Sequence, residues 1–76
     1  MAAMEYDIDI QIAGPEHHGK TTLVAYIAKL LTDAGADLIV QRADEQIDEK
    51  LALSLEELRN KISGKRILLR EIQHFP

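Results

Sequence analysis

The sequence predicts an α/β fold, a minimal β-α-β-α-β sandwich with a three-stranded parallel sheet. Residues 6–12 alternate between apolar and polar side chains, which is the period of a strand with one buried face and one wet face. From Lys20 onward the apolar spacing becomes that of an amphipathic helix. Because strand and helix patterns continue to alternate along the chain, we expect parallel strands joined by right-handed crossovers.

The first helix is expected to begin at Lys20. Its apolar side chains recur at intervals that place them on one face, at Leu23, Ile27, Leu30, Leu31 and Ala34. Gly35 suits the position just past the end of this helix, where a left-handed backbone conformation is needed. Residues 36–42 are rich in β-branched side chains and are predicted to form the second strand.

A second helix is predicted over residues 54–63. Ser54 and Glu57 form a capping-box pattern, which marks a helix start, and Gly64 ends the helix. Helical spacing also extends back through residues 44–53. We therefore expect one or two helical turns before Ser54.

Residues 65–72 are predicted to form the third strand. The order of the three strands in the sheet has two alternatives. Asp7, Asp9 and Gln11 give the first strand a polar face, whereas a central strand of a parallel sheet is normally covered on both faces. Either both helices lie on one side of the sheet, or the third strand lies between the first two in the order 2-3-1. We favour 2-3-1, which leaves exposed edges that a partner could cover.

The 76 residues are expected to form a single domain spanning positions 1–76. The sequence has no cysteine and a formal net charge of −4, which argues against a disulfide framework and against a broad nucleic-acid-binding surface. No apolar run is long enough to span a membrane and no secretory signal is visible, so we expect a cytoplasmic protein without a membrane partner. A chain this short has marginal stability, which leaves a homodimer or a protein partner as an open alternative.

The segment between the first predicted strand and the first predicted helix, Gly14 to Thr21, matches the pattern G-x-x-x-x-G-K-[ST] without a gap. Glycines allow backbone angles that a Cβ would forbid, so successive N–H groups can turn inward and surround an anion. The positive end of the following helix adds to the attraction. The sequence therefore predicts a site for the phosphates of a nucleotide.

The candidate site residues would contact the nucleotide and the metal ion through different atoms. Lys20 would reach the β- and γ-phosphates and is the first candidate for a catalytic role, while the Thr21 hydroxyl would ligate Mg²⁺. We expect the nucleotide to be ATP, or another nucleoside triphosphate, with Mg²⁺. The residues expected to contact it are Gly14, Glu16, His17, His18, Gly19, Lys20, Thr21 and Thr22.

Over residues 8–31 the sequence resembles the Walker A, or P-loop, family of nucleotide-binding proteins. Residues 18–23 are also similar to the first GTP-binding motif of translational GTPases, but Asn60-Lys61-Ile62-Ser63 lacks the aspartate with which those proteins read guanine. The whole layout, including the ending Glu71-Ile72-Gln73, looks most like the very short P-loop proteins of phages and mobile elements. The resemblance implies a truncated P-loop NTPase fold and an ATPase-like or kinase-like protein.

Phosphoryl transfer also requires a second carboxylate to orient Mg²⁺ and a cation at the γ-phosphate. Glu71 and Asp44 are the candidate carboxylates, each at the end of a predicted strand. Arg42, Arg66 and Arg70 are candidate cations, and none of them is preferred.

Three functions therefore remain open at this point. The favoured one is a nucleotide-binding module with weak or no intrinsic hydrolysis. The others are a non-enzymatic, phage-type interaction protein that uses the loop as a scaffold, and an NTPase or small kinase completed by a second subunit.

Overall fold

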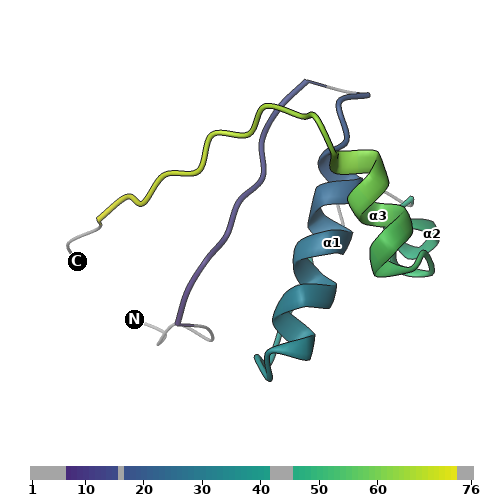
Figure 1. The fold of residues 1–76 in the computed structure, drawn as a ribbon. Coiled ribbons are helices and arrows are strands. Elements are labelled where there is room, and N and C mark those ends of the chain that lie inside the picture. Colours follow the sequence, from purple (N-terminus) through teal and green to yellow (C-terminus); the bar gives the residue numbers. More distant parts are fainter. Residues whose placement is uncertain (1–6, 16, 42–45, 74–76) are drawn as a thin grey trace.

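The computed structural model describes residues 7–15, 17–41 and 46–73. In this part of the chain three helices follow one another, α1 (Lys20–Asp33), α2 (Ile47–Leu51) and α3 (Leu55–Ile62). Figure 1 shows α2 and α3 together beside α1, with the direction of α3 roughly opposite to that of α1. The end of α3 consequently comes back to the end of the molecule where α1 begins.

Helix α1 confirms the prediction made from the apolar spacing. It starts at Lys20 and ends at Asp33. Gly35 then adopts a φ of +94°, and the Ala36 N–H donates to the Leu31 carbonyl at 3.0 Å. This bond closes the last turn in the way that a glycine just past a helix end allows.

Helix α3 begins with the capping box predicted from the sequence. The Glu57 N–H donates to Ser54 Oγ, and the Ser54 N–H donates to Glu57 Oε1, each at 3.1 Å. Two backbone N–H groups that the helix leaves unpaired are thereby satisfied. The short α2 confirms the expected helical turn before Ser54, and Gly64 follows α3 with a φ of +84°.

The core lies between the three helices. Ala25 of α1, Ile47 of α2 and Leu58 of α3 form one buried cluster, and Ala25 and Leu58 have no exposed surface. Partly buried apolar side chains pack around this cluster: Val24, Tyr26, Val40, Leu51 and Leu53. Since burying a large aliphatic side chain contributes about 1.5–3 kcal/mol, this cluster is the main source of cohesion among the described residues.

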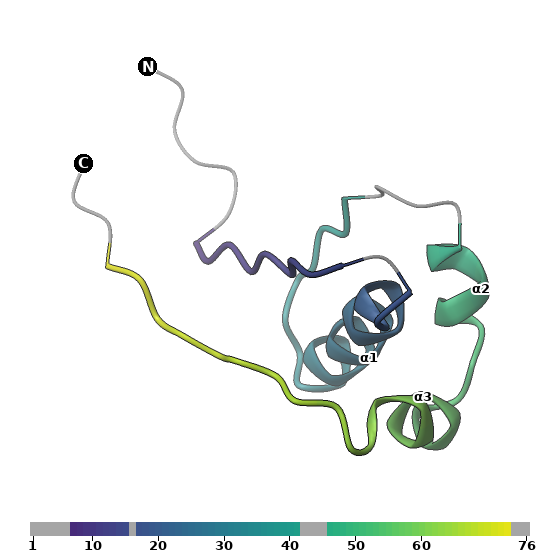
Figure 2. The ribbon, with the colours of Figure 1, turned by 90° about the horizontal axis from the view of Figure 1, so that it is seen from above.

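The α/β fold predicted from the sequence is wrong. None of the described residues lies in a β-strand, and segments 7–15, 36–41 and 65–73 have no regular secondary structure. The features that depended on the sheet are therefore wrong as well: the parallel pairing, the strand order 2-3-1, the crossovers and the truncated P-loop NTPase fold. Figures 1 and 2 show segments 7–15 and 65–73 running separately on the side of α1 away from α2.

The prediction of strands was wrong because an alternating pattern of apolar and polar residues indicates extended backbone but not strand pairing. Extended backbone places alternate side chains on the same side, and Gln11 Nε2 accordingly donates to Asp9 Oδ2 at 3.0 Å. A strand additionally needs a neighbour that accepts and donates its backbone hydrogen bonds. The predicted pattern of residues 7–12 is thus present locally without the pairing that would make it a strand.

Candidate functional site

The loop before α1 has two residues in the left-handed region of backbone space. Gly19, the residue that caps α1, has a φ of +92°, and His17 has a φ of +63°. His18 lies between them and is not among the positive-φ residues. Changes of sign between successive φ angles turn neighbouring N–H groups toward one side, which is the geometry of an anion-binding nest.

The N-terminus of α1 differs chemically from that of α3. Gly19 has no side chain with which to accept a bond from the first turn, and the first turn carries no acidic residue. The first bond of the helix joins the Leu23 N–H to the Gly19 carbonyl at 2.9 Å. The N–H groups of Lys20, Thr21 and Thr22 precede that bond and point toward the loop, at the positive end of the helix.

Lys20 folds back over the loop. A Cβ placed on Gly14 would lie 3.7 Å from both Lys20 Cγ and Lys20 Cδ, so the aliphatic part of the lysine runs against the Gly14 backbone. This contact brings the first residue of the motif and its lysine together. Gly14 itself is not among the positive-φ glycines, so the expectation of a left-handed conformation holds for Gly19 and not for Gly14.

A second lysine, Lys65, reaches the loop from the end of α3. A Cβ placed on Gly19 would lie 3.8 Å from Lys65 Cε. The sequence analysis did not single out this residue, because its position depends on α3 returning beside the start of α1 (Figure 1). The two lysines therefore lie against the two glycines of the motif.

The other predicted contact residues have different surroundings. Thr21 is half-buried in the first turn, where its hydroxyl is the candidate Mg²⁺ ligand, and Thr22 is buried on the packing face with Ala25. His17 and His18 are exposed. Glu16 lies outside the described residues.

Of the two candidate catalytic carboxylates, only Glu71 lies among the described residues, and the structure does not bring its segment to the loop. Glu71 is exposed on segment 65–73, which leaves the end of α3 and runs away from the helices (Figures 1 and 2). Arg66 and Arg70 are exposed on the same segment, while Asp44 and Arg42 lie outside the described residues. Among the described residues, no group of three or more histidine or acidic side chains could hold a metal ion.

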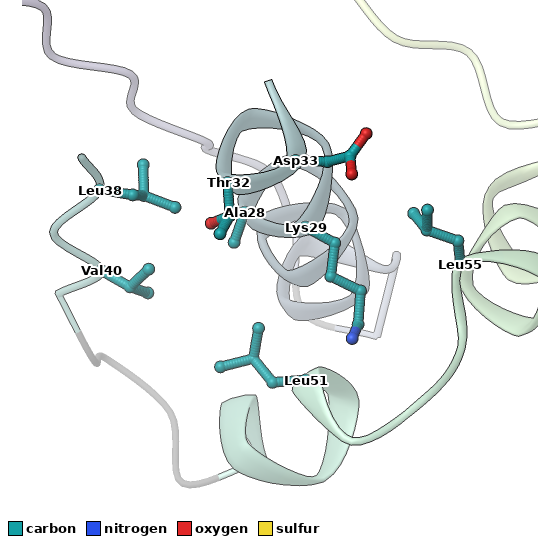
Figure 3. A pocket seen from close by; sticks show the side chains of 8 residues that line it. All are labelled: Ala28, Lys29, Thr32, Asp33, Leu38, Val40, Leu51 and Leu55. Carbon is teal, nitrogen blue, oxygen red and sulfur yellow. The ribbon is translucent and has the colours of Figure 1, made fainter. Parts of the chain in front are cut away.

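A shallow groove of about 580 Å³ lies along the second half of α1 (Figure 3). Leu38, Val40 and Leu51 face Ala28 across it. Lys29, Thr32, Asp33 and Leu55 complete its lining. The groove contains none of the loop residues, so it is separate from the candidate phosphate site.

Comparison with models of known protein families, with curated proteins and with solved structures finds no match to this chain. In the part of the chain that the structure describes, no helix has the length and apolar character needed to cross a bilayer.

Proposed function

We propose that this chain is a nucleotide-binding module that holds the phosphates of ATP, or of another nucleoside triphosphate, at the loop from Gly14 to Thr21. The observation that carries the proposal is the position of Lys20, whose stem lies 3.7 Å from the Cβ position of Gly14 at the open N-terminus of α1. A lysine folded along a loop of inward-turned N–H groups provides a mobile point charge for a phosphate. Mg²⁺ would be held by the Thr21 hydroxyl and by the phosphates themselves.

The proposed module has weak or no hydrolysis of its own. Phosphoryl transfer depends on positioned charges around the γ-phosphate and on a carboxylate that orients the metal. Among the described residues, Glu71 is exposed on segment 65–73, which runs away from the helices in Figure 1. Binding without turnover is therefore the activity that the described geometry supports best.

The test is a titration with Mg²⁺–ATP, read by calorimetry, of the wild type, Lys20→Ala and Lys29→Ala. Lys29 is the matched control because it lies on the same helix, nine residues and thus about 13 Å further along the axis. We expect Lys20→Ala to weaken binding about tenfold or more and Lys29→Ala to bind like the wild type. Equal binding by the wild type and Lys20→Ala would overturn the proposal.

Thermal unfolding provides an independent readout of the same binding. A nucleotide at about 100 times its dissociation constant stabilises the folded state by about 2.7 kcal/mol. In a domain of this size that corresponds to a rise in Tm of about 10 °C or more. Phosphate release measured in parallel over a range of protein concentrations separates binding from turnover that needs a second subunit.

A second candidate, a non-enzymatic interaction protein, is favoured by a different observation. Seven large apolar side chains among the described residues are more than half exposed: Ile8, Ile10, Ile39, Ile67, Leu68, Leu69 and Ile72. Exposed apolar surface of this extent is typical of sites that bind another protein. In this case the loop would serve as a scaffold, and Lys20→Ala would leave the association with the partner unchanged.

A further inference from the structure

Lys65 is a cation at the loop that the Walker A pattern does not include. Its Cε atom lies 3.8 Å from the Cβ position of Gly19, and its ammonium nitrogen is one bond further. Gly19 is the residue from which α1 starts and whose φ of +92° turns the neighbouring N–H groups. The exposed side chain of Lys65 thus lies beside the same backbone that is proposed to bind phosphate.

The turn after α3 fixes the backbone that carries this side chain. The Ser63 N–H donates to the Arg59 carbonyl at 2.9 Å, and the Lys65 N–H donates to the Ile62 carbonyl at 3.0 Å. Gly64, between them, has a φ of +84°, which reverses the chain at the end of the helix. Since α3 is anchored in the core by Leu58, packing sets where the backbone of Lys65 lies, while its side chain is exposed.

The two lysines lie against different glycines of the loop. Lys20 is against Gly14, at the start of the motif, and Lys65 is against Gly19, at its end. Two lysines at one loop favour a chain of several phosphates over a single phosphate, because each additional phosphate adds negative charge that a second cation can attract.

We propose that Lys65 is a second phosphate-binding cation of this loop, and that together with Lys20 it makes the site selective for the number of phosphates in the ligand. The site would prefer triphosphates to diphosphates and diphosphates to monophosphates. This inference rests on the proposed function, since it concerns the same loop. It assigns to Lys65 a role in binding and in specificity.

The experiment compares the dissociation constants of ATP, ADP, AMP and inorganic triphosphate, each with Mg²⁺, for the wild type, Lys65→Gln and Lys65→Arg. Lys29→Gln is the control, because it removes the same charge more than a Debye length of about 8 Å from the loop. We expect Lys65→Gln to weaken ATP binding about fivefold to tenfold, ADP less and AMP least. Lys65→Arg should retain most of the affinity, and inorganic triphosphate should follow ATP.

The outcomes separate this inference from the proposed function. If the wild type binds none of the four ligands, the proposed function fails and the inference fails with it. If the wild type binds and Lys65→Gln behaves like Lys29→Gln for all ligands, the inference alone is overturned. An equal loss for ATP and AMP would also overturn it, because a structural role for Lys65 would weaken every ligand alike. Unfolding curves of each variant verify that the chains compared are folded.

Discussion

At the scale of single residues, the two glycines of the motif have different physical roles. Gly19 adopts a φ of +92°, which an L-residue with a Cβ rarely takes, whereas Gly14 lies outside the positive-φ region. A Cβ on Gly14 would meet only the stem of Lys20, at the ordinary contact distance of 3.7 Å. The requirement for glycine at position 19 is therefore conformational, whereas at position 14 the space beside Lys20 admits a Cβ.

This difference predicts the effects of alanine at the two positions. Gly19→Ala should destabilise the chain by about 1–2 kcal/mol, the cost of placing a Cβ in the left-handed region. Gly14→Ala should change stability by less than about 0.5 kcal/mol, because among the described residues only the flexible stem of Lys20 is close. Urea unfolding monitored by circular dichroism checks both values. Equal destabilisation by the two substitutions would contradict the assignment of strain to Gly19.

At the scale of elements, the capping box of α3 pairs the free backbone N–H groups at the start of the helix, and it makes the stability of the chain depend on pH. The backbone N–H of Ser54 donates to the Glu57 carboxylate and holds the pKa of that carboxyl below its usual value of 4.5, and the Ser54 side chain and the charge of Lys61 lower the pKa further. A carboxyl whose pKa is lowered on folding stabilises the folded state above its unfolded pKa. The contribution is lost as the pH falls through the lowered, folded value.

We predict that the stability of Glu57→Gln depends less on pH in the acid range than the stability of the wild type does. The stability of the wild type should fall between about pH 4.5 and the lower folded pKa of Glu57, and this part of the fall should be missing in the variant. Glu56→Gln is the control, since it removes the same charge from the same helical turn without touching the capping box. The measurement is Tm as a function of pH for the three proteins. If Glu56→Gln flattened the profile and Glu57→Gln did not, the cap would not be its origin.

The helices were predictable from the sequence because their signals are local. The apolar spacing after Lys20, the capping box of Ser54 and Glu57, and the glycine after each helix all act within a few residues. The prediction of a sheet was wrong because the alternation in residues 6–12 indicates only an extended segment with one apolar and one polar face. It does not indicate whether a second strand lies beside that segment to pair with it.

The same distinction applies to the candidate site. The loop and Lys20 are contiguous in sequence, so the motif was sufficient to find them and to predict their proximity. Lys65 is far from Gly19 in sequence and reaches it because α3 packs beside α1 in the opposite direction (Figure 1). No periodicity carries that information, since it arises from the packing of Ala25 and Leu58 in one core.

At the scale of the whole molecule, the chain exposes more surface than a compact monomer. Its accessible surface is 7141 Å², whereas a compact protein of 8.5 kDa exposes about 4,700 Å². Segment 65–73 contributes the most exposed of the large apolar side chains, Leu69, at 91%.

We therefore expect the wild type to self-associate through the exposed apolar side chains of segment 65–73. The double substitution Leu68→Ser/Leu69→Ser should weaken this association at least about tenfold. Each leucine buried at an interface contributes about 1.5–3 kcal/mol, and 1.4 kcal/mol corresponds to a factor of ten in the dissociation constant. Sedimentation equilibrium over a range of concentrations measures the effect. Leu30→Ser is the control, because Leu30 is an exposed leucine on α1, outside the extended segments. A wild type that stays monomeric at every concentration would show that the exposed surface does not join copies of this chain.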